Sequence, residues 1–560
     1  MTADERARLA EVEQAILGRR PEHSIDPSLD RITDLVTLLG DPHRAYPVIH
    51  ITGTNGKTST ARMTERLLRA RGLRTGLFTS PHLMSMRERI CVDGEPLSPE
   101  AFIAAYEEIE PYLDLVDSRQ PGRLSFFEVL VGMAFATFAD APVDVAVIEV
   151  GIGGTWDNTN VADGAVAVLT PVAIDHVRWL GSTIEEIATT KAGIIKPGAI
   201  AVMGQQLPAA AEAILRRVAD VGATVAREGM EFGVLSRELA VGGQRLSVRG
   251  LLGDYDDLFL PLFGAYQASN LACALAAVEA FARADATALP SGPDEAANGH
   301  SAGAGRAEAA LGILPGHDPD EAGDTDSGDT DPGGTDSGGA DTGRARPDRT
   351  GLARDYDREL DRGLDAELGP ERGPGAAGAG EGTPLDIGLV RDAVAAITSP
   401  GRLEIVRRSP VVILDAAHNP AGMAATVAAL EESFTFSDLI VIAAISADKD
   451  AAGILDQLEP VATQLIATGN ASGRALPAAE LAETAEVIFG PDRVSTVPRL
   501  DEAIEVAVRL ADEADADNPD GPGGPGGAAV LITGSVVTAG DARVLLTRGP
   551  ALSLHDGDRP

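Results

Sequence analysis

The sequence has few cysteines, few lysines and no long apolar run, and each scarcity narrows the class of protein. The two cysteines, Cys91 and Cys273, imply no disulfide framework. No run of about 18 apolar residues is present to span a bilayer, and the first residues lack the apolar core of a signal peptide. The formal charge of −39 argues against nucleic acid or an anionic membrane as partner. We therefore expect a soluble, cytoplasmic protein.

Lysine is the scarcest of the common charged residues. Of 46 basic residues only four are lysines, namely Lys57, Lys191, Lys196 and Lys449. Lysine is a compact charge whose pKa can fall far enough to give a neutral amine, which arginine cannot do. We therefore expect the four lysines to lie where a guanidinium cannot replace an ammonium. The alternative explanation for their scarcity is drift in codon usage.

Residues 47–72, PVIHITGTNGKTSTARMTERLLRARG, combine a short strand, a glycine turn and an amphipathic helix. This order, with a lysine and hydroxyls after the turn, is typical of a phosphate-binding loop. Backbone N–H groups would hold the phosphates, Lys57 would reach the β- and γ-phosphates, and Thr58 or Ser59 would touch Mg²⁺. Ile51 stands where the full pattern has its first glycine, and an ordinary βα turn is the alternative.

Two blocks of alternating strands and helices flank an acidic, glycine-rich stretch. Between Ser291 and Gly380 there are 20 Asp and Glu against eight Arg, so this stretch cannot bury enough apolar surface to fold. We predict a disordered insertion at 286–383. Residues 1–285 and 384–400 would form one domain, and residues 401–560 a second domain with a short disordered break at 512–527.

The predicted fold class is α/β. It consists of an N-terminal P-loop-type ATPase domain with a mainly parallel sheet and a smaller, Rossmann-like C-terminal domain. In the first domain strands are expected near 47–51, 74–78, 143–150, 165–169 and 200–203, with an antiparallel patch near 232–263 and a helix over 266–284. In the second domain they are expected at 411–414, 439–443, 464–467, 486–488 and 529–532.

Polar side chains follow three predicted strands of the first domain, where parallel sheets place their sites. Glu149 ends one strand, Asp175 and His176 follow another, and Ser80 and His82 follow a third. A carboxylate, an imidazole and a hydroxyl beside a nucleotide loop indicate a Mg²⁺ site. His176 is the least expected ligand because Mg²⁺ prefers oxygen, and a structural histidine is the alternative.

A series of motifs resembles, in order, the folylpolyglutamate synthase/dihydrofolate synthase family of Mur-type ligases. The motifs are GTNGKTS, TSPHL with RERI, EVGIGG, DHVRWLG, KAGIIKPG, GAYQASN, SPGRLE, LDAAHNP, ISADKD and ITGSVVTAGDAR. The resemblance covers nearly the whole chain except the acidic insertion and the short break. It implies that ATP phosphorylates the terminal carboxylate of a pteroate or folate, and that the amine of L-glutamate then forms an amide.

The resemblance also implies a set of site residues. Contacts to ATP are implied for Thr54, Asn55, Gly56, Lys57, Thr58, Asn270, Arg402 and Asp415, and contacts to the pterin for Ser125, Phe126, Phe127, Glu128, Trp156, Asp157 and Asn158. Two Mg²⁺ ions are implied, with Ser80, Glu149, His176 and a carbamylated Lys191 as ligands, and catalytic roles for Lys57, Lys191, His418 and Lys449. Lys196 is expected to face elsewhere on the helix of Lys191.

Two alternatives stay open. A related Mur-type ligase acting on another carboxylate would normally carry a further N-terminal domain, for which the 46 residues before Pro47 are too few. A nucleotide-binding regulatory protein without turnover would not need Lys57, Glu149, His176 and Lys191 together. Both dihydrofolate synthase and folylpolyglutamate synthase activity fit the motifs, and the family implies a monomer.

Overall fold

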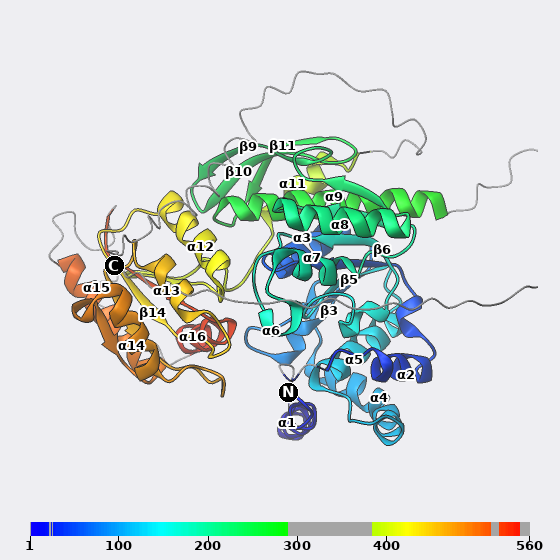
Figure 1. Cartoon of the computed structure of the whole chain (residues 1–560), viewed down its shortest axis with the longest axis horizontal. Coiled ribbons are helices and arrows are strands. Elements are labelled where there is room, and N and C mark those ends of the chain that lie inside the picture. Colours follow the sequence, from blue (N-terminus) through cyan, green and yellow to red (C-terminus); the bar gives the residue numbers. More distant parts are fainter. Residues whose placement is uncertain (1, 22–23, 25, 289–383, 517–525, 549–560) are drawn as a thin grey trace, which may run out of the picture. The chain divides into compact units, whose positions relative to one another are not determined.

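The structure is a computed structural model that describes residues 2–21, 24, 26–288, 384–516 and 526–548 (Figure 1). The insertion predicted at 286–383 lies outside the described residues except at 286–288, which continue a helix. We call residues 2–288 with 384–400 the N-terminal lobe and residues 401–548 the C-terminal lobe. None of the helices in these ranges combines the length and the apolar character that a membrane span requires.

An eight-stranded sheet forms the centre of the N-terminal lobe, and its strand order is β4-β3-β2-β5-β1-β6-β7-β8. The strands are β1 (Val48–Thr52), β2 (Thr75–Phe78), β3 (Ile90–Val92), β4 (Glu95–Pro96), β5 (Val145–Glu149), β6 (Gly164–Leu169), β7 (Ile200–Met203) and β8 (Thr224–Arg227). The six strands from β2 to β8 in this order run parallel, and β3 and β4 add an antiparallel edge. Their carboxyl ends therefore meet at one edge, as the phosphate-loop prediction requires.

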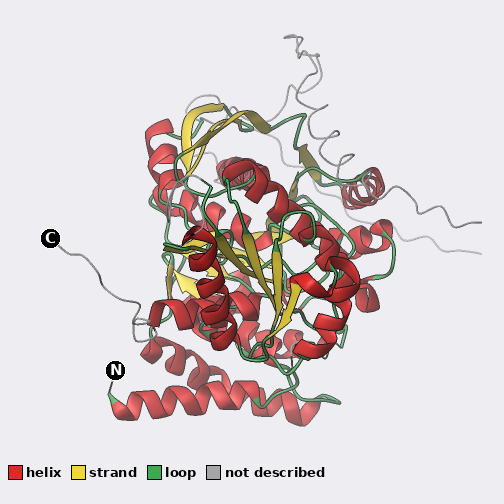
Figure 2. Ribbon diagram, turned by 90° about the vertical axis from the view of Figure 1, so that its left-hand side faces the viewer, coloured by secondary structure: helices red, strands yellow, loops and turns green. Residues whose placement is uncertain are grey.

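Helices cover both faces of this sheet because alternate residues of each strand point to opposite sides. In β5, Val145 and Val147 belong to one core, and Ala146 and Ile148 belong to the other. The first core includes α3 (Lys57–Ala70), α9 (Ala265–Ala288) and α11 (Ile387–Ala395). The opposite face carries α1 (Ala3–Leu17), α2 (Asp30–Leu38), α4 (Pro99–Arg119), α5 (Phe126–Asp140), α7 (Ile184–Ala192) and α8 (Pro208–Val221). Figure 2 shows strands enclosed by helices in this way.

A small antiparallel sheet lies along α9 (Figure 1). It contains β9 (Gly233–Ala240), β10 (Gly243–Arg249) and β11 (Asp254–Leu260), in the order β11-β10-β9. The side chains of Leu246, Val248 and Leu258 from this sheet join the core around α9. The antiparallel patch expected near 232–263 is thus present.

The C-terminal lobe has a six-stranded sheet of order β12-β13-β17-β14-β15-β16. The strands are β12 (Glu404–Arg408), β13 (Val411–Leu414), β14 (Leu439–Ala443), β15 (Gln464–Ala467), β16 (Val494–Thr496) and β17 (Ala529–Thr533), and only β12 is antiparallel. One face packs on α12 (Pro420–Ser433), α13 (Ala451–Leu458) and α14 (Ala478–Phe489), and the other on α15 (Leu500–Ala516) and α16 (Val536–Arg548). The two lobes confirm the predicted fold class.

Two predictions for the C-terminal lobe were wrong in detail. The strand expected at 486–488 is the end of α14, because Leu481, Ala485 and Phe489 recur at helical spacing and are buried while Val487 is exposed. Of the break expected at 512–527, residues 512–516 complete α15, and residues 517–525 lie outside the described residues. The β-branched residues of 486–488 suit a strand locally, but the buried face of the helix decides the outcome.

Candidate active site

The phosphate loop joins β1 to α3 through two glycines with positive φ. Gly53 has φ of +149° and Gly56 has φ of +86°. A Cβ atom on Gly53 would lie 1.8 Å from Oγ1 of Thr170, and one on Gly56 would lie 2.5 Å from Oδ1 of Asn270. Neither position has room for a side chain, so the loop backbone comes close to its neighbours only because both residues are glycine.

Lys57 begins α3 and folds its ammonium back over the loop. Its Nζ donates to the carbonyl oxygens of Gly53 and Thr54, each at 3.1 Å. Burial lowers the pKa of Lys57, and the nearby cations Lys449 and Arg402 act in the same direction. The charge is therefore held out of water at the first helical turn, where the helix dipole also favours an anion.

Glu149, at the end of β5, is buried beside this loop. Its Oε1 accepts a hydrogen bond from Oγ1 of Thr58 at 2.8 Å, and its Oε2 accepts from the backbone N–H of Ser80 at 3.1 Å. Burial raises the pKa of Glu149 despite these donors and the charge of Lys57. The structure thus brings together the predicted residues Lys57, Thr58, Ser80 and Glu149.

Lys191 lies at the end of α7, and its side chain is buried against the same loop. Its Nζ donates to the carbonyl oxygen of Gly53 at 2.7 Å. Burial, with a contribution from Lys57, lowers the pKa of Lys191 to about 7. Lys196 does face elsewhere, with Nζ 2.8 Å from the carbonyl oxygen of Asn160, but not for the expected reason, because α7 ends before it.

Asp175 follows β6, and its carboxylate accepts hydrogen bonds from side chains of the C-terminal lobe. Its Oδ1 accepts from Nζ of Lys449 at 2.6 Å, and its Oδ2 accepts from Nδ2 of Asn419 at 3.0 Å. Asn419 also donates to Oδ1 of Asn55 in the phosphate loop, at 3.1 Å. Burial alone would raise the pKa of Asp175, but the charges of His176, Lys449 and His418 hold it below its usual range.

His176 and His418 both approach this carboxylate. Their Nε2 atoms each lie 3.9 Å from Oδ2 of Asp175, beyond hydrogen-bonding distance. Burial lowers the pKa of His176 to about 3 and that of His418 to about 4. Nδ1 of His418 is 3.0 Å from the carbonyl oxygen of Ala416. The neutral ring donates from Nδ1 there, which leaves Nε2 free of a proton.

The other predicted ATP contacts lie on both lobes. Asn270 on α9 is buried beside Gly56, as its contact with that glycine shows. Arg402 and Asp415 belong to the C-terminal lobe, on either side of β12 and β13. Asp415 accepts from the backbone N–H groups of Leu403 and Ala417 and from Oγ1 of Thr426, at 2.9 to 3.0 Å, so it braces the loop after β13. Burial raises its pKa.

The first predicted pterin stretch, Ser125 to Glu128, starts α5. Ser125 caps the helix, and Glu128 completes the capping box while pairing with Arg31 at 2.9 Å. The guanidinium of Arg89 lies over the ring of Phe126, 5.0 Å from its centroid. Phe127 packs on Gly151 so closely that a Cβ there would lie 2.6 Å from the ring.

The second predicted pterin stretch, Trp156 to Asn158, lies in the turn after β5. Asp157 is buried and accepts from the backbone N–H groups of Ile152 and Thr159, at 2.9 and 3.0 Å. Trp156 is partly buried beside Gly153, and Asn158 starts a 3₁₀ helix at Asn158–Val161. The contact of Phe127 with Gly151 brings the two stretches to the same edge of the sheet.

Two residues that join the site received no role from the sequence. Asp175 was recognised only as the polar end of a strand, and Asn419 only as part of the motif LDAAHNP. The signal for Asn419 is local, because an asparagine before Pro420 is a typical helix N-cap, and its Oδ1 accepts from the backbone N–H of Gly422 at 2.7 Å. The contact with Asn55 joins residues 364 positions apart, and no local pattern predicts it.

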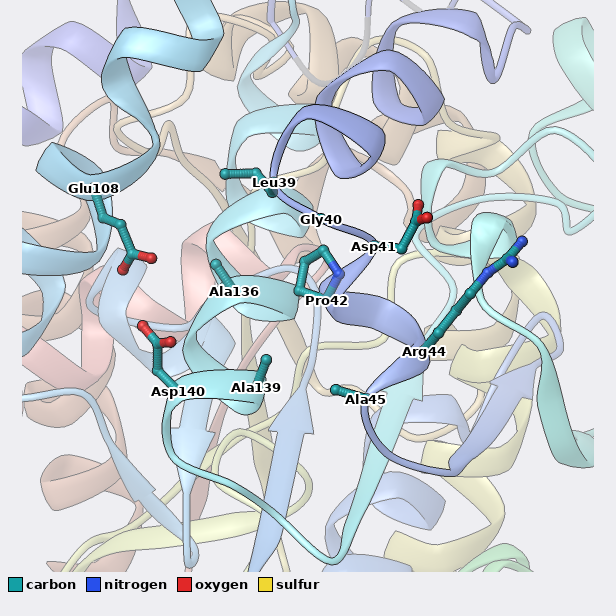
Figure 3. Close-up of a pocket in the computed structure, with 10 residues that line it drawn as sticks. All are labelled: Leu39, Gly40, Asp41, Pro42, Arg44, Ala45, Glu108, Ala136, Ala139 and Asp140. Carbon is teal, nitrogen blue, oxygen red and sulfur yellow. The ribbon is translucent and has the colours of Figure 1, made fainter.

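A separate cavity of about 420 Å³ contains none of these residues (Figure 3). It lies between the end of α2, α4 and α5, and is lined by Leu39, Gly40, Asp41, Pro42, Arg44, Ala45, Glu108, Ala136, Ala139 and Asp140. The carboxylates of Glu108 and Asp140 face each other (Figure 3), and partial burial together with Asp140 raises the pKa of Glu108.

The match to known families agrees with this geometry. Residues 121–278 match the family described as "Mur ligase middle domain", and residues 401–535 match "Mur ligase, glutamate ligase domain". A nucleotide loop on a parallel sheet, facing lysine and histidine from a second α/β lobe, is therefore the site of a Mur-type ATP-dependent ligase.

Similar proteins narrow the class. The chain is 43% identical to the dihydrofolate synthase/folylpolyglutamate synthase of Mycobacterium tuberculosis, over 98% of this chain and 96% of that protein. It matches the M. tuberculosis folylpolyglutamate synthase complexed with ADP with a TM-score of 0.76 and 42% identity, over 97% and 99% of the two chains. It also matches an FPGS–AMPPCP–folate complex with a TM-score of 0.65 and 27% identity, over 96% and 99%. The chain belongs to the dihydrofolate synthase/folylpolyglutamate synthase family.

Proposed function

We propose that the chain adds L-glutamate, with conversion of ATP to ADP and inorganic phosphate, to dihydropteroate, to tetrahydrofolate polyglutamates, or to both. The observation that carries the proposal is the convergence of Lys57, Glu149, Lys191 and Lys449 where the phosphate loop meets the C-terminal lobe. Membership of a family whose relatives are named for both activities supports it. The reaction passes through an acyl phosphate, because a carboxylate is a poor acyl donor until phosphorylation supplies a leaving group.

The residues of the chain then divide the work. Backbone N–H groups of Thr54 to Lys57 hold the phosphates, and Lys57 neutralises charge as the phosphoryl group moves. Lys449 brings a second ammonium from the other lobe. His418, with its Nδ1 bonded to Ala416, can accept at Nε2 the proton that the amine of glutamate loses. Asn270, Arg402 and Asp415 would contact the nucleotide, as the family resemblance implies.

The donor set fits Mg²⁺. Glu149 is a buried carboxylate with a raised pKa, which a cation would stabilise in its charged form. Among the described residues no three His, Cys, Asp or Glu side chains gather to hold a metal by themselves. Mg²⁺ is usually bound by one or two carboxylates together with substrate phosphates, which suits this arrangement. Ser80, Glu149 and His176 would hold it, and the ion would neutralise charge on the phosphoryl oxygens.

Lys191 would join these ligands as a carbamate. An ammonium next to a divalent cation would be repelled, whereas a carbamate offers oxygen atoms that a hard metal prefers. Only a neutral amine reacts with CO₂, and a buried lysine whose pKa lies near 7 supplies a neutral amine at physiological pH. The burial of Lys191 against Gly53 supports this assignment.

Substrate contacts follow the family pattern. Ser125 to Glu128 and Trp156 to Asn158 would bind the pterin, and the short contact between Phe127 and Gly151 supports a shared pocket wall. The enzyme would act as a monomer in the cytoplasm on small molecules alone. A nucleotide switch without turnover is the competing function, and it requires neither a folate nor glutamate.

Measurement of ADP release tests the proposal. Purified protein is supplied with MgATP and L-glutamate, together with either dihydropteroate or tetrahydrofolate. We expect ADP release that requires both glutamate and at least one of the two pterins, with a product one glutamate heavier by mass spectrometry. ADP release that is the same without glutamate and pterin would show a simple ATPase or switch instead.

A further inference from the structure

Asp175 is a residue of the N-terminal lobe whose carboxylate is bonded to the C-terminal lobe. Lys449, from the loop after β14, approaches Oδ1 to 2.6 Å, and Asn419, the N-cap of α12, approaches Oδ2 to 3.0 Å. The carboxylate is nearly buried, and the Lys449 side chain is only 10% exposed. A charged hydrogen bond of this length, shielded from water, is among the stronger contacts that a protein makes.

The same carboxylate does not orient the adjacent imidazole. Nε2 of His176 lies 3.9 Å from Oδ2, too far for a hydrogen bond, and Nε2 of His418 lies at the same distance. Within its own segment Asp175 accepts only the backbone N–H of His176, at 2.7 Å. The side chains that donate hydrogen bonds to Asp175, among the described residues, are therefore those of Lys449 and Asn419, both from the other lobe.

The two partners of Asp175 reach the phosphate loop. Asn419 and Asn55 exchange two amide hydrogen bonds, at 3.1 and 3.3 Å. Lys449 lies close enough to Lys57 to lower the pKa of that lysine. The ammonium groups of Lys57 and Lys449 repel each other. The approach of Lys449 is therefore unfavourable unless a carboxylate offsets the repulsion. Asp175 is the carboxylate that contacts Lys449 directly.

We propose that Asp175 is a positioning residue that docks Lys449 and the first turn of α12 against the phosphate loop, so that the second ammonium reaches the transferring phosphoryl group in register. The proposal rests on the ligase function given above. Asp175 contacts neither nucleotide nor acceptor in this role and acts through Lys449. Its loss should therefore slow turnover while leaving nucleotide binding to the loop itself nearly unchanged.

The test compares Asp175→Asn, Lys449→Met and the double variant in the full chain. The steady-state measurements are kcat and KM for glutamate- and folate-dependent ADP release, and calorimetry gives Kd for ADP. We expect Asp175→Asn to lower kcat by about tenfold or more with Kd for ADP changed by less than about threefold. The double variant should be no slower than Lys449→Met, because residues that act as one unit are not additive.

Arg237→Gln is the matched control. Arg237 on β9 pairs with Glu432 on α12, so this variant also removes an ion pair between the lobes, but it lies outside the site. Its kcat should stay within about twofold of the wild type, since interface charges away from the chemistry contribute little. A tenfold loss in Arg237→Gln would mean that any weakened lobe contact slows turnover, and it would overturn a specific role for Asp175.

Asp175→Glu controls for a loss of activity that is caused by unfolding alone. It keeps the charge and should retain more kcat than Asp175→Asn at a similar melting temperature. Equal losses in both variants, or additive losses in the double variant, would overturn the proposal. If the wild type released ADP at the same rate without folate and glutamate, the ligase function would be contradicted instead. The failure of that function therefore shows in the wild type, and the failure of the Asp175 proposal shows in the variants.

Discussion

The ammonium nitrogen of Lys191 donates a hydrogen bond to the carbonyl oxygen of Gly53 at 2.7 Å. The end of α7 is thereby tied to the start of the phosphate loop. Thr170 fills the space where a side chain of Gly53 would lie, and the lysine contacts the carbonyl oxygen of the loop backbone. Any chemical change at Nζ would therefore act directly at the loop that we propose holds phosphate.

The carbamate assignment predicts a rescue. We expect Lys191→Ala to lower kcat by about a hundredfold or more, because a buried charge that stabilises the transition state is lost. Acetate, whose two oxygens imitate a carbamate, should restore part of the activity. Steady-state kinetics with and without acetate measures this effect.

Two further variants separate the carbamate from a plain cation. Lys191→Arg should be as inactive as Lys191→Ala, since a guanidinium supplies charge but does not form this carbamate. Lys196→Arg should be mild, because its ammonium only reaches the carbonyl of Asn160. Full activity in Lys191→Arg would exclude the carbamate.

Gly56→Ala is expected to damage the phosphate loop. The new Cβ would meet Oδ1 of Asn270 at 2.5 Å, and φ of +86° costs an L-residue about 1–2 kcal/mol. We expect the free energy of unfolding to fall by a similar amount and ADP affinity to fall about tenfold, since the loop must shift. Denaturant titration and calorimetry provide the two values.

Gly122→Ala is the control for this substitution. A Cβ at Gly122 meets nothing within 4 Å, and its φ is not positive. Its free energy of unfolding should change by no more than about 0.5 kcal/mol, and ADP affinity should not change. If Gly56→Ala bound ADP like the control, the loop would not depend on its glycine.

His50 predicts a dependence of stability on pH. This buried residue of β1 has its Nε2 2.9 Å from Oγ1 of Thr159, and burial lowers its pKa to about 3. Between pH 6.5 and pH 3 the unfolded chain binds a proton that the folded chain does not, so stability is lost as the pH falls through this range. From pH 7 to pH 5 this amounts to about 2 kcal/mol, at 1.36 kcal/mol for each pKa unit.

His50→Gln removes the titrating group and can still reach Thr159. Its free energy of unfolding should fall by about 2 kcal/mol less than that of the wild type between pH 7 and pH 5. Part of the remaining slope would come from His43, whose pKa burial also lowers. Identical slopes in the two proteins would show that His50 takes up its proton over the same pH range in the folded and the unfolded chain.

Arg31 and Glu128 form a buried ion pair whose disruption should be costly. The two side chains are 6% and 1% exposed, and their atoms lie 2.9 Å apart. Arg31→Leu would leave the buried carboxylate of Glu128 with fewer partners, and we expect a loss of about 3 kcal/mol in the free energy of unfolding.

Arg499→Leu provides the exposed counterpart. Arg499 pairs with Asp501 at the surface, where water and salt screen such pairs and they contribute little to stability. Denaturant titration of both variants should give clearly different losses. Similar losses would mean that solvent reaches the Glu128 pair in solution.

Much of the fold follows from the sequence because its strands are short apolar runs between turn residues. The strand Ile200–Met203 has the same bounds as predicted, and so does Leu439–Ala443. The strand expected at 486–488 failed because burial of a helical face outweighs local β-propensity. Strands β8 and β12 were missed, since each has exposed positions and completes a sheet only through its neighbours.

The positions of some site residues could be predicted from the sequence, and those of others could not. The polar residues at strand ends could be found because parallel strands bring their carboxyl ends together, as for Ser80 and Glu149. The roles of Asp175 and Asn419 could not, because their contacts join segments more than 200 residues apart. Such pairs depend on how the two lobes meet, which the order of motifs along the chain does not contain.

The Asn419 side chain makes three contacts at once: its oxygen caps α12, and its amide nitrogen donates to Asn55 of the phosphate loop and to Asp175. A nucleotide that draws Asn55 away would remove one of the contacts that fix the Asn419 side chain, and the protection of the capped turn should change with it. The backbone amide of Gly422 is thus a natural reporter. Its rate of exchange with heavy water should record occupancy of the phosphate loop without any label being introduced.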